Sequence, residues 1–111
     1  MTPLFPTPTR CGHPAIKAAR QCKTAMELAN ADRPDAAEQL LRSALGGLRQ
    51  AGLPMMRAKI MNSLGLVYAQ RNEHRRARRC LSVSLRIVAG HVGVDNGLYA
   101  RIAGSRDRLP D

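Results

Sequence analysis

The sequence repeats itself at a shift of 40 residues, and this internal repeat constrains the fold more than any other feature. The matched positions are mostly apolar, with one polar turn position, in the pairs Leu28–Tyr68, Ala29–Ala69, Asp32–Asn72, Ala37–Ala77, Leu41–Leu81, Leu45–Leu85 and Leu48–Val88. A period of roughly 20 to 50 residues is typical of arrays in which each repeat is one supersecondary unit. Because the turn matches along with the apolar positions, we expect two copies of one structural unit.

Each copy has the periodicity of two helices separated by a short break. Apolar residues recur every three or four positions in both halves of each copy, which indicates amphipathic helices. The helices are expected to begin at Ala15, at Pro34, near Met55, after Asn72 and near Asp95. Asn72 is the expected N-cap of the fourth helix, which runs through Val88. The second helix is expected to stop at Gly52, and Gly46-Gly47 inside it predicts either a bend or a close neighbour.

These elements predict one helical domain behind a short tail. Residues 1–14 contain four of the seven prolines, so we expect them to be extended and mobile. The domain then covers residues 15–110, with repeat one at 15–52, repeat two at 54–91 and a capping helix at 94–109.

The composition suits a helical core and a reducing compartment. Aromatic residues make up 3% of the chain and Trp is absent, so the core is expected to consist of Ala, Leu, Ile, Val and Met. Cys11, Cys22 and Cys80 are odd in number and not closely paired, which disfavours a disulfide framework. No segment has the pattern of a signal peptide or a membrane span, so a cytoplasmic protein without membrane contact is expected.

The second copy resembles the tetratricopeptide repeat. The resemblance rests on the run Asn62-Ser63-Leu64-Gly65-Leu66-Val67-Tyr68, followed by Ala77 and Leu81. Gly65 and Ala77 lack bulk where two antiparallel helices must touch, and larger residues surround that contact. The resemblance implies stacked antiparallel hairpins, a fragment of a right-handed α-solenoid, in an all-α fold. The first copy matches less well, and Ser84 and Ala89 also depart from the pattern. The 40-residue shift is similar to the longer-helix variants of bacterial regulatory and scaffold proteins, beyond the common period of about 34.

The resemblance also implies a binding module, because the first helix of each hairpin lines the concave face of such arrays. By position, the peptide-binding residues on that face would be Lys23, Met26, Asn30, Lys59, Asn62, Leu66 and Gln70, completed by Tyr99 or Arg106. An Asn side chain can bond both backbone groups of an extended peptide, and a Lys can hold a carboxylate. A plain solvated helix face is the alternative for each of these residues.

A run rich in arginine suggests a second function. Five arginines fall within the nine residues 71–79, and the chain has a formal net charge of +10. The predicted basic patch consists of Arg71, Arg75, Arg76, Arg78, Arg79 and Arg86. Its first members face the positive end of a helix, which is unfavourable without an acidic partner. An acidic protein or a nucleic acid would compensate the positive charge of the patch. The run has no aromatic residue for base stacking, so nucleic acid is the second choice, and a solvated surface remains the alternative.

Nothing in the sequence predicts catalysis. His13, His74 and His91 have no carboxylate or thiol at a spacing that builds a site, and phosphate-binding loops are absent. We expect no enzyme activity, no cofactor and no metal, because Cys11 and His13 alone make a weak zinc pattern. Two hairpins and one weak helix make a small stack, so self-association through the open ends of the stack, as a homodimer, is expected.

Overall fold

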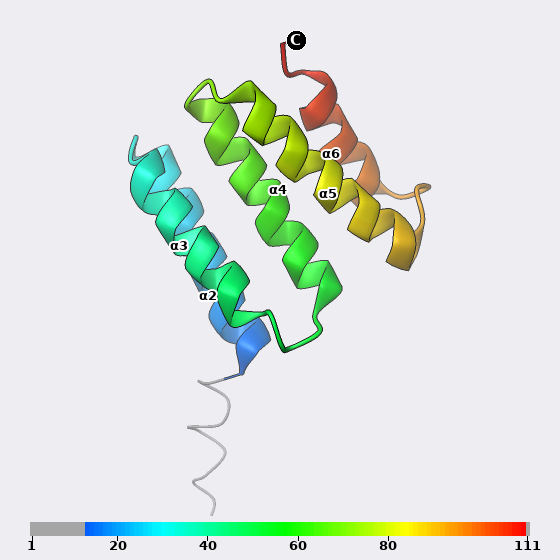
Figure 1. Cartoon of the computed structure of the whole chain (residues 1–111), viewed down its shortest axis with the longest axis horizontal. Helices are drawn as coiled ribbons and strands as arrows, with labels where there is room; N and C mark the ends of the chain where they lie inside the picture. Colours follow the sequence, from blue (N-terminus) through cyan, green and yellow to red (C-terminus); the bar gives the residue numbers. More distant parts are fainter. Residues whose placement is uncertain (1–12, 111) are drawn as a thin grey trace, which may run out of the picture.

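The computed structural model describes residues 13–110, and this part of the chain is all-helical. Its helices are α2 (Pro14–Asn30), α3 (Pro34–Gly47), α4 (Pro54–Gln70), α5 (His74–Val92) and α6 (Gly97–Asp107) (Figure 1). The first three begin at a proline, whose fixed φ and missing N–H suit the first helical position. The prediction of an all-α fold is confirmed. Residues 1–12, which are most of the predicted tail and include Cys11, lie outside the described residues.

Successive helices pack as antiparallel neighbours. α2 packs against α3, α4 against α5, and α5 against α6, while α4 also contacts α2 and α3. Figure 1 shows α3, α4 and α5 side by side, with α2 behind α3 and α6 behind α5. α4 therefore joins the two hairpins, and its side chains decide how the first copy of the repeat contacts the second.

The two copies turn in the same way between their helices. Asp32 and Asn72 both have positive φ angles, of 65° and 62°. In each copy the next residue donates its N–H to the carbonyl five residues back over 2.9 Å, in the pairs Arg33 to Leu28 and Glu73 to Tyr68. This bond marks a Schellman ending, in which Asn and Asp tolerate the left-handed conformation. The expectation that Asn72 is the N-cap of the next helix is therefore wrong, because Asn72 ends α4 and α5 begins at His74 without a side-chain cap.

The turn at Asn72 gives a first testable prediction. Asn72→Gly should raise the free energy of unfolding by up to about 1 kcal/mol, because a left-handed conformation costs residues with a Cβ roughly 1–2 kcal/mol. The greater freedom of Gly in the unfolded chain offsets part of that gain. Asn72→Ala should lower the same free energy by about 1 kcal/mol. Urea denaturation of both variants measures the difference, and equal stability of the two would contradict the left-handed turn.

The second helix is shorter than expected. α3 ends at Gly47, not at Gly52, and the chain turns through residues 48–52. A Cβ built at Gly46 or Gly47 meets nothing within 4 Å, so no neighbour approaches these glycines closely. Neither predicted role is correct, because the two glycines lie at the end of the helix, where their low helix propensity helps to terminate it.

The outer helices also differ from their expected bounds. α6 runs from Gly97 to Asp107, inside the predicted span 94–109, because the Asn96 side chain caps it. Asn96 Oδ1 accepts the N–H of Tyr99 at 2.8 Å. α2 includes Pro14, the last residue assigned to the tail, and His13 Nδ1 accepts the N–H of Ala15 at 3.1 Å in front of it.

The contact between α4 and α5 depends on a residue without a side chain. A Cβ at Gly65 would lie 2.7 Å from Leu81 Cγ and 3.3 Å from the carbonyl oxygen of Ala77. Ala77 and Leu81 are both fully buried, so the expectation that Gly65 and Ala77 lie at a close helix contact is confirmed. Ser84 is also fully buried, and its hydroxyl donates to the carbonyl of Ala58 at 2.7 Å. That bond satisfies the polar atom that departs from the repeat pattern.

Candidate functional site: the open face of α4 and the basic surface

α4 is the central helix, and its residues separate into two opposite sides. Its buried residues are Ala58, Ile60, Ser63, Leu64, Gly65, Val67 and Tyr68. The predicted binding residues Lys59, Asn62, Leu66 and Gln70 follow one another at three- and four-residue spacing, so they share one side of the helix. Lys59, Leu66 and Gln70 are exposed, with Leu66 at 37%, and Asn62 is half-buried. We call this row the α4 stripe.

The predicted residues of α2 lie beside the α4 stripe. Cys22 Sγ lies 3.2 Å from Ser63 Oγ, and Gln70 Nε2 donates to the carbonyl of Ala29 at 2.9 Å. Both contacts join residues 41 positions apart, so α2 and α4 run parallel to each other. Lys23 and Asn30 are exposed next to these contacts, and Met26 between them is half-buried. The two helices thus bring together the predicted residues of both copies, and Gln70 also holds the helices together.

Asn62 and Tyr99 differ from the rest of the predicted binding face. The side-chain oxygen of Asn62 is buried and has no hydrogen-bond partner among the described residues. A buried, unpartnered acceptor is unusual in a folded protein, so the Asn62 oxygen lacks the donor that such an atom normally has. Tyr99 is half-buried and packs against the apolar cluster around Leu85, Val88 and Ile102, so its ring belongs partly to the core.

The arginine run does not form one uniform patch. Arg75, Arg79 and Arg86 are exposed on α5. Arg78 is half-buried, and its guanidinium donates to the carbonyl of Pro110 at 2.9 Å, which ties α5 to the segment after α6. Arg106, the alternative to Tyr99, lies 3.5 Å from its neighbour Asp107. Some arginines of the run therefore hold the fold together, and others face solvent.

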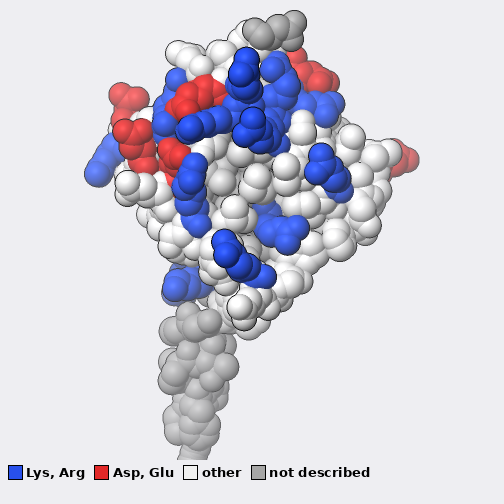
Figure 2. Space-filling view, in the orientation of Figure 1, with Lys and Arg blue, Asp and Glu red and all other residues white. Residues whose placement is uncertain are grey.

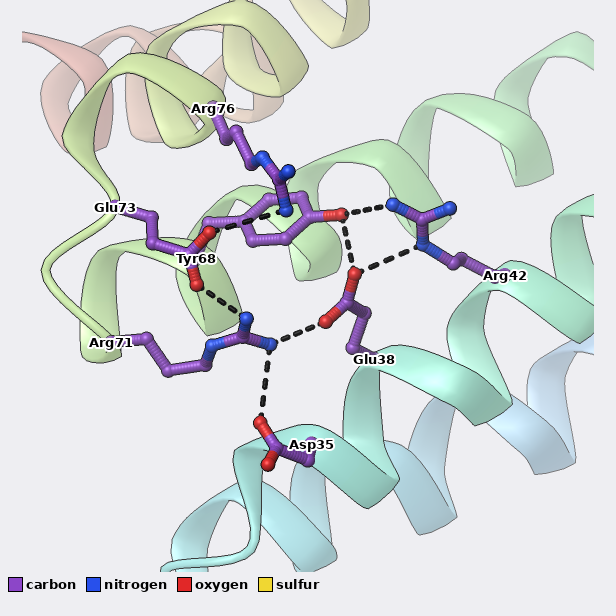
Figure 3. Close-up of polar contacts among 7 residues, drawn as sticks. All are labelled: Asp35, Glu38, Arg42, Tyr68, Arg71, Glu73 and Arg76. Carbon is purple, nitrogen blue, oxygen red and sulfur yellow. Dashed lines mark hydrogen bonds and ion pairs between the residues drawn. The ribbon is translucent and has the colours of Figure 1, made fainter.

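Arg71 in particular pairs with carboxylates of its own chain. Figure 3 shows the surrounding group, which we call the ion-pair cluster: Asp35, Glu38, Arg42, Tyr68, Arg71, Glu73 and Arg76. Arg71 forms ion pairs with Glu38, Glu73 and, at 3.4 Å, Asp35. The side chains of Arg71 and Glu38 are 24% and 15% exposed, so the pair is largely removed from water. The carboxylates that pair with Arg71 thus come from α3 (Asp35 and Glu38) and from the turn before α5 (Glu73).

Tyr68 lies in the middle of the ion-pair cluster. Its hydroxyl donates to Glu38 Oε2 at 2.8 Å and accepts from Arg42 Nη2 at 2.9 Å (Figure 3). The guanidinium carbons of Arg71 and Arg76 lie 5.8 and 5.7 Å from the ring centroid, within cation–π range. The cluster therefore fastens α3 of the first copy to the end of α4 and the start of α5.

The surroundings in the cluster shift the pKa values of Glu38 and Tyr68 in opposite directions. Burial alone would raise the pKa of Glu38, but the hydrogen bonds from Arg71 and Tyr68 and the nearby charges outweigh burial and lower that pKa. Burial raises the pKa of Tyr68, which the hydrogen bond from Arg42 opposes in part. At neutral pH the cluster therefore holds a carboxylate ion and a neutral phenol.

Sequence reasoning missed the role of Glu38 because its partners are distant along the chain. Glu38 lies 33 residues from Arg71 and 30 from Tyr68. One signal is present in the sequence: Glu38 is acidic where the matched position of the second copy, Arg78, is basic. This difference in charge at a matched position is consistent with Glu38 making contacts that Arg78 does not make.

Within residues 13–110, no group of three or more His, Cys, Asp or Glu side chains is placed to hold a metal ion. No helix in the described part of the chain is both long and apolar enough to cross a bilayer. No family model, curated protein or solved structure matches the chain.

Proposed function

We propose that this chain is a tetratricopeptide-like protein-binding module that holds a peptide or a partner protein along α2 and α4. The observation that carries the proposal is the α4 stripe: along one side of the central helix, next to α2, lies a row of polar and apolar side chains that are exposed or half-buried. The proposal includes the stacked-hairpin arrangement of a short α-solenoid, with this row on the concave side.

Two features of the fold support a repeat architecture. The Schellman endings at Asp32 and Asn72 are the same turn at a shift of 40 residues. The close approach of Gly65 to Leu81 places the smallest residue where the two helices of one hairpin meet. The turn is shared by both copies, the close helix contact at Gly65 belongs to the second, and the concave side of stacked hairpins is an extended binding surface.

The chemistry of the α4 stripe suits a polypeptide ligand. Once the half-buried Asn62 side chain turns outward, its unpartnered oxygen can accept a backbone N–H of the ligand, and the Lys59 ammonium can hold a carboxylate. Leu66 and Met26 supply apolar contact in the middle of the face. An acidic partner is favoured, because the chain carries a formal net charge of +10.

A pull-down with the tagged full-length chain tests the proposal. Lys59→Ala combined with Asn62→Ala should reduce the recovery of the bound partner by about tenfold, because two polar contacts of roughly 0.7 kcal/mol or more each are removed. Recovery is measured by quantitative mass spectrometry of proteins retained from native cell extract.

The matched control is Lys17→Ala combined with Gln50→Ala, which removes one charge and one amide from exposed positions off the α4 stripe. This control should recover the partner as well as the unchanged chain does. Unchanged recovery with the Lys59 and Asn62 variant would contradict binding on this face.

Nucleic-acid binding through the arginine run has less support. Arg71 and Arg76 are paired with carboxylates of the chain, and Arg78 donates to backbone carbonyls. Phosphate contacts would have to compete with these bonds, which leaves Arg75, Arg79 and Arg86 as the exposed members of the predicted patch that form no ion pair within residues 13–110.

A further inference from the structure

A second surface lies on the side of α4 opposite the α4 stripe. An open cavity of about 370 Å³ runs between α3, α4 and α5. Its apolar floor is formed by the half-buried side chains of Leu45, Met61 and Val83, one from each helix. Three arginines surround that floor: Arg42, Arg49 and Arg57. We call this cavity the arginine groove.

The arginine groove has uncompensated positive charge. No Asp or Glu of the described residues lines it. Arg42 is paired with Glu38 at 3.0 Å, whereas Arg49 and Arg57 are exposed and form no ion pair within residues 13–110. Like charges around one hollow repel each other until an anion lies between them, so the groove favours a negatively charged ligand.

The positive surface continues toward the start of α5. A neighbouring cavity of about 250 Å³ shares Arg42 and is lined also by Arg76, Arg79 and Cys80. Figure 2 shows Lys and Arg side chains spread over this face of the molecule, with the Asp and Glu side chains gathered mainly toward its upper edge. The two cavities share Arg42, and arginines line both of them, whereas the apolar floor belongs to the arginine groove.

We propose that the arginine groove binds an acidic segment of a partner protein in which large apolar side chains stand among the carboxylates. The apolar side chains would cover Leu45, Met61 and Val83, and the carboxylates would pair with Arg49 and Arg57. The volume is within the range of about 300–1,000 Å³ that is usual for ligand sites. This site is separate from the α4 stripe, because Arg57 and Lys59 lie two residues apart on a helix and point to opposite sides.

Two other occupants fit the arginine groove less well. A nucleic acid would gain from base stacking, but Tyr68 is the one aromatic side chain at either cavity, and it is 4% exposed with Arg71 and Arg76 beside its ring. Residues 1–12 of the chain contain Leu4 and Phe5 but no Asp or Glu, so they lack the charge that the groove requires.

Fluorescence anisotropy with a defined probe tests the proposal. The probe is a short fluorescein-labelled peptide in which pairs of Asp and Glu alternate with single Leu or Phe residues, titrated with the full-length chain. Arg49→Ala combined with Arg57→Ala should weaken its affinity by about tenfold, since two partly exposed ion pairs are lost. Arg75→Ala combined with Arg86→Ala removes the same charge from α5 outside the groove and should have little effect.

A pair of glycine variants tests the groove by shape. Gly46 lines the arginine groove and Gly47 does not, and a Cβ at either position meets nothing within 4 Å. Gly46→Leu should therefore fill the groove and reduce binding by about tenfold, whereas Gly47→Leu should not. Lys59→Ala combined with Asn62→Ala should leave probe binding unchanged, which separates this site from the α4 stripe.

Three results would overturn the proposal. An equal loss of probe affinity in the Arg49/Arg57 and Arg75/Arg86 variants would show that the probe responds only to the net charge of the protein. Equal affinity for a probe with Ser in place of Leu and Phe would show that the apolar floor is not used. Tighter binding of a single-stranded oligonucleotide, weakened by the same groove variants, would assign the groove to nucleic acid.

Discussion

Gly65→Ala is expected to lower the free energy of unfolding by about 2 kcal/mol. The new Cβ would lie 2.7 Å from Leu81 Cγ and 2.8 Å from Leu81 Cδ2, and Leu81 is fully buried between helices. Overpacking of this kind costs up to about 3 kcal/mol. The gain of about 1 kcal/mol in helix propensity from Gly to Ala offsets only part of that cost. Urea denaturation followed by far-ultraviolet circular dichroism measures the change.

Gly90→Ala is the matched control for this prediction. Gly90 is also a helical glycine, on α5, but a Cβ there meets nothing within 4 Å. The substitution should therefore raise the free energy of unfolding by up to about 1 kcal/mol, through helix propensity alone. A stabilising effect at both positions would mean that α4 and α5 are not in close contact at Gly65.

Glu38→Gln is expected to lower the free energy of unfolding by about 2 kcal/mol at neutral pH. The Glu38 carboxylate accepts hydrogen bonds from Arg42 at 3.0 Å, from the Tyr68 hydroxyl at 2.8 Å and from Arg71. Hydrogen bonds to charged groups contribute roughly 1.5–3 kcal/mol each, and the amide keeps part of this geometry. The substitution removes the charge that holds Arg71 while it preserves the shape of the side chain.

The effect of Glu38→Gln should depend on pH in a defined direction. The pKa of Glu38 in the folded protein lies below its ordinary value of 4.5. A lowered folded pKa means that the stabilisation is present at neutral pH and is lost as the pH falls below that ordinary value, through the folded pKa. The difference between the unchanged chain and the Glu38→Gln variant should therefore shrink when urea denaturation is repeated in acid.

Glu27→Gln provides the control for this experiment. Glu27 is exposed on α2 and forms no ion pair with another described residue. Its substitution should change the free energy of unfolding by less than about 0.5 kcal/mol at neutral pH. A Glu38→Gln effect of the same size at neutral and at acid pH would contradict a stabilising carboxylate charge.

The helices were predictable because their signals are local. Apolar residues at three- and four-residue spacing placed every helix, and Pro34 marked the start of α3; α2 and α4 also begin at a proline, one residue before their predicted starts. The sequence predictions were wrong at the ends of helices, where alternative backbone conformations differ little in free energy. Asn72 has the chemistry of an N-cap and also of a left-handed helix ending, and the backbone adopts the second.

The candidate binding residues were predictable only in part. The α4 stripe follows from periodicity, because residues three or four apart share a side of a helix. The arginine groove does not, since Leu45, Met61 and Val83 come from three helices and have no common pattern in the sequence. The sequence also grouped Arg71 with Arg75 and Arg79, although one lies in an ion-pair cluster and the others face solvent.

The repeat at 40 residues, taken alone, determined that the chain forms matched helices with a turn at Asp32 and at Asn72. The run Leu64-Gly65 and the small size of Gly65 also identified it as a contact residue, because side-chain size and helical spacing are local properties. Only the tertiary structure decided which arginines carry unpaired charge and where an apolar hollow lies beside them. Charge pairing depends on distances through space, and Glu38 reaches Arg71 only after the two hairpins have packed together.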